Sequence, residues 1–352
     1  MNRIPSVEEL ALSKVLVTGG AGYIGSHVMA VLARQGLRSV CVDNFANSSP
    51  AAIERARELV PGAIEFFEAD IRDVPALGRI LEDSEITSVI HLAGLKAVGE
   101  SLEFPDRYYD NNVHGTRCLL EALSGSRVRQ FVFSSSATVY GPAQQMPITE
   151  SAPTAPQSPY GQNKLDIEHM LAQLVRDDPA WRVINLRYFN PVGAHESGLI
   201  GENPAGIPSN LMPFVCQTAS GRREALRIFG DDYPTPDGTC IRDFIHVMDL
   251  AEGHLAALRT LEGEAPGTTM TCNLGTGRGH SVLELVETFE RVNRISVPRT
   301  VAGRRPGDVV VSFADCSLAR SALGWTARRD LEDMCRDAWQ WQLRSESAYA
   351  RA

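Results

Sequence analysis

The stretch KVLVTGGAGYIGSH, residues 14–27, carries the strongest fold signal in this chain. An apolar run typical of a β-strand is followed by Gly19, Gly22 and Gly25 and then by a helix-like pattern. Such glycines permit a tight turn, close approach of the backbone to a pyrophosphate, and close packing of helix on strand. The helix start offers free N–H groups to an anion. The stretch therefore predicts a phosphate-binding strand–loop–helix unit, although a plain strand-to-helix turn would use the same glycines.

The first half of the chain repeats this alternation. Short β-rich runs alternate with longer helix-like segments, and several runs are nearly all apolar, as in strands covered on both faces. The pattern predicts an α/β fold with a Rossmann-type, doubly wound parallel sheet and right-handed crossovers. The expected strands are 14–19, 39–44, 63–70, 88–94, 130–136 and 182–190, and the clearest expected helices are 105–123 and 158–177.

The second half of the chain differs in composition and pattern. From about residue 191, glycine and proline become frequent and the alternation fades. A chain of 352 residues is long enough for two lobes. We expect a dinucleotide-binding domain over residues 1–190 and a smaller α/β substrate lobe over 191–352. The helix-like stretch RDFIHVMDLAEGHLAAL predicts a return to the first domain near 240–260.

Composition restricts the compartment and the partners. Thirty-four basic against 43 acidic residues give a net charge of −9, which suits solubility and not the coating of nucleic acid. The seven cysteines are scattered without C-x-x-C pairs, which favours reduced thiols in a cytoplasm. The start of the chain does not resemble a signal peptide, and no apolar run approaches the ~20 residues that span a bilayer. The eight histidines lack metal-binding spacing, so we expect no metal. From the net charge and the lack of a long apolar run we expect no nucleic-acid partner and no membrane partner.

Asp43 ends the second expected strand, 18 residues beyond Gly25. A carboxylate there accepts hydrogen bonds from a ribose 2′-hydroxyl and repels a 2′-phosphate. It could equally cap the next turn. In its functional role it predicts NAD, and not NADP, as the cofactor.

A second group of polar residues follows the fifth expected strand. FSSSATVYG places Ser134, Ser135 and Ser136 at the carboxyl end of that strand, the edge at which open α/β sheets bind ligands. Tyr160 and Lys164 follow, four residues apart and therefore on one face of a helix. Serines also form turns, and a Tyr/Lys pair is often part of an ordinary amphipathic face. Combined with the glycine loop and a strand-end acid, the group predicts a dinucleotide-dependent reactive site.

These motifs resemble the extended short-chain dehydrogenase/reductase superfamily. Longer strings spread over the chain resemble the UDP-glucose 4-epimerase family, among them HLAGLKAVGES, SSSATVYG, RYFNPVGAH, GIPSNLMP and RDFIHVMDLA. The resemblance implies interconversion of UDP-galactose and UDP-glucose, in galactose metabolism, through a 4-keto intermediate and transient NADH. Tyr160 as a phenolate would take the 4-hydroxyl proton while C4 passes hydride to NAD. Ser136 would hold the same oxygen, and Lys164 would make the phenol basic.

The phenol needs help from more than one charge. Lowering its pKa from about 10 to about 7 takes roughly 4 kcal/mol. One positive charge ~5 Å away contributes about 3 kcal/mol at an effective dielectric constant near 20. Lys164 and the positive nicotinamide ring are therefore expected to act together.

The resemblance also implies binding positions. The implied cofactor positions are Gly19, Gly22, Tyr23, Ile24, Gly25, Asp43, Asn44, Asn47, Ser48, Asp70, Ile71, Ala93, Gly94, Lys96, Asn112, Ser136, Tyr160 and Lys164. The implied substrate positions are Asn190, Asn210, Leu211, Arg242, Arg305, Asp308 and Ser312, with the two arginines on the diphosphate. Finally, the two clearest helices pair between subunits in this family, which implies a homodimer.

Ser312 bears on substrate choice. Family members confined to plain hexoses carry a bulky Tyr at the matching position. A serine leaves room for an N-acetyl group, so UDP-GalNAc and UDP-GlcNAc are further expected substrates. The alternative is that Ser312 faces solvent.

Two other functions fit less well. A nucleotide-sugar 4,6-dehydratase needs an added acid–base pair just after the strand-end hydroxyl, and here the sequence reads Ser136, Ala137, Thr138. A dinucleotide-sensing regulator without catalysis usually lacks the Tyr or the Lys, and both are present.

Overall fold

The computed structural model describes residues 14–82, 85–203, 206, 208–305 and 307–349. The signal-peptide prediction made from the start of the chain lies outside this part. Within the described residues, no helix combines the length and apolar character needed to cross a membrane.

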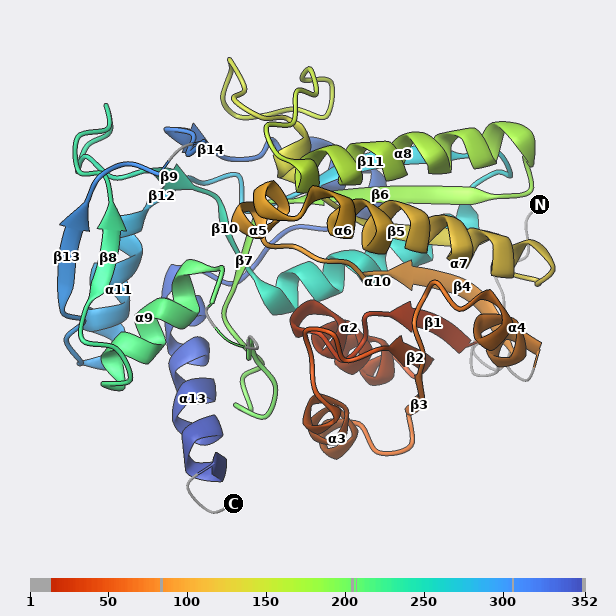
Figure 1. Ribbon diagram of the computed structural model, residues 1–352, viewed down its shortest axis with the longest axis horizontal. Helices are drawn as coiled ribbons and strands as arrows, with labels where there is room; N and C mark the ends of the chain where they lie inside the picture. The colour runs from red at the N-terminus through yellow and green to blue at the C-terminus, as the bar shows by residue number, and fades with distance from the viewer. Residues whose placement is uncertain (1–13, 83–84, 204–205, 207, 306, 350–352) are drawn as a thin grey trace.

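A seven-stranded sheet forms the larger half of the molecule (Figure 1). Every pairing in it is parallel, in the order β11-β6-β5-β4-β1-β2-β3. Its strands are β1 (Lys14–Thr18), β2 (Arg38–Asp43), β3 (Ile64–Glu68), β4 (Ile86–His91), β5 (Gln130–Ser136), β6 (Arg182–Tyr188) and β11 (Thr269–Leu274). The six strands expected from the sequence are confirmed, with small shifts at their ends. The order runs outward in both directions from the β1/β4 pair, so a ligand crevice is expected beyond the carboxyl ends of these two strands.

Helices cover both faces of this sheet, as a doubly wound fold requires. On one face, Val28 and Leu32 pack with Leu255 and Leu258 in one core, and Leu119 and Leu171 lie in the core of the other face. The first layer contains α2 (Tyr23–Arg34), α3 (Pro50–Leu59), α10 (Val247–Gly263) and α12 (Ser317–Leu323). The second contains α4 (Val74–Glu82), α7 (Gly115–Ser124) and α8 (Pro159–Asp177).

The two clearest predicted helices are present. The predicted helix 158–177 is α8, and the Ser158 side chain caps its start by accepting the Gly161 N–H at 3.1 Å. The predicted helix 105–123 is a composite of α6 (Pro105–Tyr109), a wider π-type turn η1 (Asp110–His114) and α7. A short helix, α5 (Val98–Glu103), precedes it.

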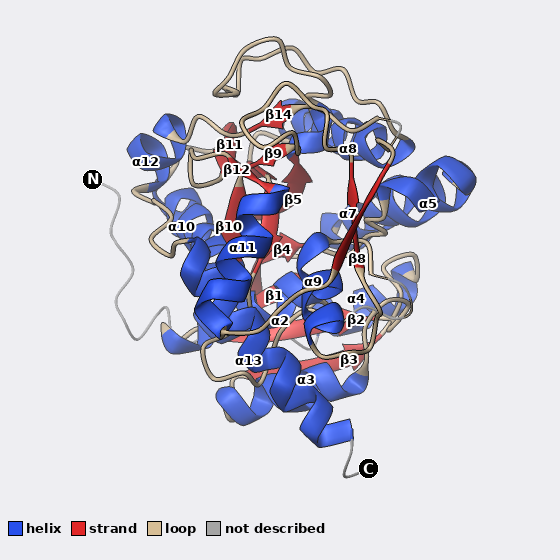
Figure 2. Cartoon of the chain, turned by 90° about the vertical axis from the view of Figure 1, so that its left-hand side faces the viewer, coloured by secondary structure: helices blue, strands red, loops and turns tan. Residues whose placement is uncertain are grey.

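A smaller lobe lies at the left of Figure 1 and toward the viewer in Figure 2. Its own core contains Val215, Phe289 and Met334. Its helices are α9 (Leu211–Ala219), α11 (Val282–Asn293) and α13 (Leu331–Tyr349). Its short strands form the pairs β7 (Asn190–Val192) with β10 (Phe244–His246) and β8 (Leu226–Phe229) with β13 (Arg299–Ala302), and the trio β12 (His280–Ser281), β9 (Ile241–Arg242), β14 (Val311–Ser312).

The chain returns to the large sheet after entering this lobe. Helix α10 packs against α2, and β11 pairs with β6 from Thr269↔Val183 to Leu274↔Tyr188. The second lobe is thus interrupted by a helix and a strand of the first. A domain boundary at residue 190 stays a prediction.

Candidate active site

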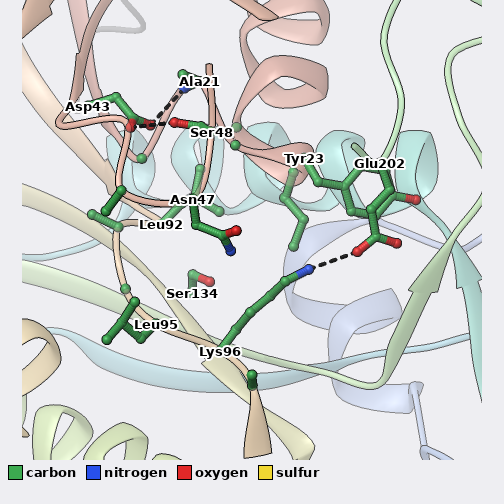
Figure 3. Close-up of a pocket in the computed structure, with 18 of the residues that line it drawn as sticks. Ala21, Tyr23, Asp43, Asn47, Ser48, Leu92, Leu95, Lys96, Ser134 and Glu202 are labelled. Atoms are coloured by element: carbon green, nitrogen blue, oxygen red, sulfur yellow. Dashed lines mark hydrogen bonds and ion pairs between the residues drawn. The ribbon is translucent and has the colours of Figure 1, made fainter. Parts of the chain in front are cut away.

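A cavity of about 870 Å³ opens where the strands of the large sheet end and the second lobe begins (Figure 3). Its walls come from the segments that follow β1, β2, β3, β4, β5 and β6, joined by residues 199–203, 209–210 and Trp341 of the second lobe. The cavity therefore lies at the crevice that the strand order predicts.

The glycine loop between β1 and α2 forms one wall of this cavity. Gly19 has φ +71°, and a Cβ there would lie 2.7 Å from the Ala93 nitrogen. A Cβ on Gly25 would lie 2.3 Å from the Gly19 oxygen and 2.6 Å from the Gly20 Cα. Gly22 is the N-cap of α2 and makes no side-chain cap, so the start of the helix, which lines the cavity, is not capped by a side chain of that residue. The loop is shaped to take a phosphate group against its backbone.

Asp43 caps the turn after β2 and keeps an acceptor site for a ligand. Its Oδ2 accepts the Ala21 N–H at 3.0 Å, which ties the strand end to the glycine loop (Figure 3). Its Oδ1 accepts the Phe45 N–H at 2.9 Å and the Ser48 hydroxyl at 2.8 Å, which caps the following turn. A carboxylate has about four acceptor sites, so capacity remains for a ribose hydroxyl facing the cavity. The residues of this wall fit an NAD-type dinucleotide.

Most of the other implied cofactor positions line the cavity. They are Tyr23, Ile24, Asn44, Asn47, Ser48, Ile71, Ala93, Gly94 and Lys96. Asp70 and Asn112 are not among its lining residues. The Asp70 carboxylate binds Arg72 at 2.7 Å, and this ion pair lowers its pKa. Asn112 is buried and clamps the loop after β4 through its hydrogen bonds to the Leu95 N–H (2.8 Å) and C=O (3.0 Å).

Ser136, Tyr160 and Lys164 line the same cavity, with 8%, 9% and 5% of their surfaces exposed. The Ser136 oxygen accepts both the N–H (3.2 Å) and the hydroxyl (3.0 Å) of Thr138, so its own proton is available for another acceptor. The Lys164 ammonium donates to the Ser134 carbonyl at 2.7 Å and lies 5.9 Å from the centre of the Tyr160 ring. The strand end and the helix face thus meet as the sequence predicts.

Burial dominates the protonation of this group in the protein alone. Burial raises the pKa of Tyr160 to about 12, and the Ser136 hydroxyl opposes the rise only in part. Burial lowers the pKa of Lys164 to about 8, with the Glu168 carboxylate opposing the fall. The protein's own groups therefore do not make the phenol basic, in line with the expectation that Lys164 is insufficient by itself.

A buried ion pair supports this group from behind. Glu168 lies one turn beyond Lys164 on α8 and binds the Arg187 guanidinium through both oxygens, at 2.9 and 2.5 Å. Ser135 donates to the same carboxylate at 2.5 Å. Because Ser135 sits between the two serines that face the cavity, the pair fixes the end of β5.

The implied substrate positions fall into two groups. Asn190 and Asn210 line the cavity, whereas Leu211, Arg242, Arg305, Asp308 and Ser312 are not among its lining residues. Arg242 and Arg305 flank Asp308, at 3.6 and 3.3 Å. Ser312 pairs in register with Arg242 in the β14–β9 ladder, and both are half-buried. Leu211 packs against the core of the second lobe.

Several lining residues escaped the sequence analysis. Thr138 orients Ser136, and the motif SSSATVYG offered a signal for it. Glu202 and Trp341 reach the cavity from the second lobe, and Arg55 reaches it from α3, 5.2 Å from the Trp341 ring. No local pattern marks these three, because only the packing of distant segments brings them together. Among the described residues, no group of three or more His, Cys, Asp or Glu side chains could hold a metal ion.

Comparison with known proteins agrees with this geometry. Residues 15–275 match the NAD dependent epimerase/dehydratase family. The UDP-glucose 4-epimerase of Dictyostelium discoideum is 52% identical over 337 residues, which cover 96% of this chain and 98% of that protein.

Two solved structures are also similar to this chain. A UDP-glucose 4-epimerase from Stenotrophomonas maltophila, with bound NAD and formylated UDP-arabinopyranose, is 49% identical with a TM-score of 0.92 and covers 95% of this chain and 99% of its own. The enzyme from Bifidobacterium longum, in complex with NAD+ and UDP, is 45% identical with a TM-score of 0.91, at the same coverage.

Proposed function

Because this chain belongs to the NAD dependent epimerase/dehydratase family, we propose that it interconverts UDP-galactose and UDP-glucose with NAD as its cofactor. One observation carries the assignment. Ser136, Tyr160 and Lys164 line the same cavity as the glycine loop, in a chain about half identical to curated UDP-glucose 4-epimerases over nearly its full length. The cavity thus combines a loop suited to the cofactor of those relatives with side chains suited to the proton transfer in their reaction.

The residues divide the chemistry between them. NAD, held by the glycine loop and Asp43, would supply a reversible hydride acceptor for C4 of the sugar. Tyr160 takes the proton from the 4-hydroxyl and gives it back after the ring has turned over. Ser136 donates its free proton toward the same oxygen, and Lys164, fixed on the Ser134 carbonyl, places a positive charge beside the phenol. No net redox change results.

Incubation of the purified protein with UDP-galactose, without added NAD, tests this function. Separation of the nucleotide sugars is expected to show UDP-glucose as the sole product, because a cofactor that is restored in every cycle need not be supplied. Absence of product, both alone and after NAD is added, would contradict the proposed function.

Acceptance of N-acetylhexosamine substrates is a further part of the proposal. It rests on the serine at position 312, which adjoins Arg242 in the β14–β9 ladder. UDP-N-acetylgalactosamine should be converted at a rate comparable to that of UDP-galactose, and Ser312→Tyr should lower the first rate selectively. Brisk turnover of UDP-galactose beside near-zero turnover of the N-acetylated sugar would refute it.

We also propose that the protein forms a homodimer through the composite helix of α6, η1 and α7 and through α8. A hollow between these helices is lined by Val113, Leu120, Met170 and Leu174 with polar residues around them, and Tyr109 at its edge is 47% exposed. Such an apolar face suits a second copy of the chain. Sedimentation should give twice the monomer mass, and Leu120→Asp should give the monomer; a monomeric wild type would contradict the proposal.

A cytoplasmic location completes the proposal. Cys41, Cys272 and Cys335 are buried free thiols, the state expected in a reducing compartment. Cell fractionation should recover the protein with cytoplasmic markers, and recovery from an oxidising compartment would contradict this.

A further inference from the structure

An ion pair crosses the cavity from one lobe to the other. The Lys96 ammonium, on the loop after β4, lies 2.9 Å from Oε1 of Glu202, on the segment that leads to α9. Figure 3 shows the lysine extended through the cavity to the carboxylate, which lies beside Tyr23. Both residues line the cavity, and they are 106 positions apart in the sequence.

Glu202 is held more firmly than an exposed ion-pair partner. Its side chain is only 9% exposed, against 37% for Lys96. The same Oε1 accepts a second hydrogen bond, from the Asn210 amide at 2.7 Å. The Trp341 indole donates to the Glu202 carbonyl at 3.1 Å, and a Cβ on Gly201 would lie 2.3 Å from the Trp341 ring, which fixes the backbone.

A buried carboxylate is a costly group at this place. The proposed function requires the cavity to take two diphosphates, those of NAD and of the UDP-sugar, and a third anion repels both. Burial of its charge is also unfavourable unless the charge is paired and hydrogen-bonded. Both donors to Glu202 belong to the ligand positions implied by the sequence, Lys96 on the cofactor side and Asn210 on the substrate side.

We propose that Glu202 is a positioning residue that holds Lys96 and Asn210 in register, and so couples the cofactor half of the cavity to the UDP-sugar half. This rests on the proposed function. The Oε1 of the carboxylate accepts from both donors in charge-assisted hydrogen bonds, whereas the amide oxygen of a glutamine would accept from them without the negative charge, and such bonds are weaker. Glu202→Gln therefore loosens the hold on both side chains, most of all on the Lys96 ammonium, while it keeps the size of the residue.

The expected result is a loss of binding in both halves. In the NAD-loaded enzyme, Glu202→Gln should raise the KM for UDP-galactose and the Kd of UDP about tenfold, with kcat changed less than threefold. The rate of NAD release, followed by gel filtration and absorbance, should rise by a similar factor. Glu196→Gln is the matched control, since Glu196 lies on the same segment, is 55% exposed and binds Arg34. It should change none of these quantities by more than twofold.

Two double-variant series separate positioning from a general structural effect. In a Lys96→Met background, Glu202→Gln should change NAD release less than twofold, and in an Asn210→Ala background it should change the UDP Kd less than twofold. The proposal would be overturned if Glu202→Gln changed NAD release or the UDP Kd by the same factor in these backgrounds as in the wild type. Tighter binding of both ligands by Glu202→Gln would also overturn it, because the carboxylate would then act only by repulsion.

Two further outcomes are a Glu202→Gln variant that does not fold and a wild type without epimerase activity. If Glu202→Gln does not fold, coupling through Glu202 still requires Lys96→Met to weaken UDP binding and Asn210→Ala to speed NAD release, and the absence of both effects would overturn the proposal. A wild type that leaves UDP-galactose unchanged refutes the proposed function instead, while the NAD-release series still decides whether Glu202 positions Lys96.

Discussion

The proposed cofactor half and the proposed substrate half of the site are built in different ways. On the cofactor side, Gly19 and Asp43 stand at the ends of the adjacent parallel strands β1 and β2, and Gly25 lies in the first turn of α2, so their positions follow from the backbone. On the proposed substrate side, Arg242 and Arg305 lie outside the cavity lining, come from a two-residue strand and a loop, and are held by Asp308. The first half is set by steric contacts of the main chain, and the second by ion pairs between side chains.

This difference has consequences for tolerance to change. Steric contacts in a close-packed backbone cannot relax, so a single added methyl group disturbs the cofactor side. Partly exposed ion pairs contribute little to the free energy of unfolding, so the substrate side should lose affinity without losing its fold. Four experiments test this contrast.

Tyr160→Phe should have the largest effect. The substitution removes the phenolic oxygen and keeps the buried ring, so turnover of UDP-galactose should fall about 10³-fold, within the usual range for loss of an acid–base group. Initial rates measure the effect, and the denaturation midpoint should stay near the wild-type value. Activity within tenfold of wild type would show that another group moves the proton.

Lys164→Met should change how the free energy of unfolding depends on pH, because it removes a buried titratable group. Burial lowers the pKa of Lys164 from 10.5 to about 8, so between these values the unfolded chain binds more protons than the folded one, and stability rises with pH. The difference in free energy of unfolding, wild type minus Lys164→Met, should therefore rise with pH. The rise should be at most about 1.4 kcal/mol per pH unit, or roughly 2 to 3 kcal/mol between pH 8 and pH 10. Taking the difference cancels other titrating groups, and a difference that stays flat over this window would contradict the shift.

Gly25→Ala should damage the cofactor side through the backbone. The new Cβ would lie 2.3 Å from the Gly19 oxygen, so the loop must shift, at a cost of about 1 to 3 kcal/mol in stability and with loss of retained NAD. Chemical denaturation and the NAD content of the purified protein measure both. Gly78→Ala in α4 is the matched control, because its Cβ meets nothing within 4 Å and should stabilise slightly. Equal behaviour of the two variants would remove the contrast between the halves.

The arginines should affect affinity more than stability. Arg305→Ala removes a guanidinium that is 58% exposed, so the KM for UDP-galactose should rise about tenfold while stability changes by less than about 0.5 kcal/mol. Arg242→Ala should raise KM as well and cost about 0.5 to 1.5 kcal/mol, because Arg242 also donates to the Val309 carbonyl at 2.7 Å. An unchanged KM in both variants would remove these residues from the diphosphate site.

Much of this protein was determined by local sequence patterns. The glycine loop and the strand-end acid occupy one β-α-β unit, and Tyr160 and Lys164 share one helix, so local spacing was enough to expect them at one sheet edge, and all of them line the cavity. Several strands of the large sheet, among them β1, β4 and β5, were likewise visible as largely apolar runs because they are buried on both faces, whereas the edge strand β3 is mostly half-buried.

Only the tertiary structure decided the remaining features. It added β11 to the large sheet, brought Glu202 to Lys96, and placed Trp341 against Gly201. It also set the Arg242 and Arg305 cluster beside the cavity without making it part of the lining. Each of these contacts joins segments distant in sequence, and their energies come from packing and charge pairing that leave no periodic trace in the residues nearby. A strand end or a helix face is fixed by its own neighbours, whereas a contact between two lobes exists only after both have folded.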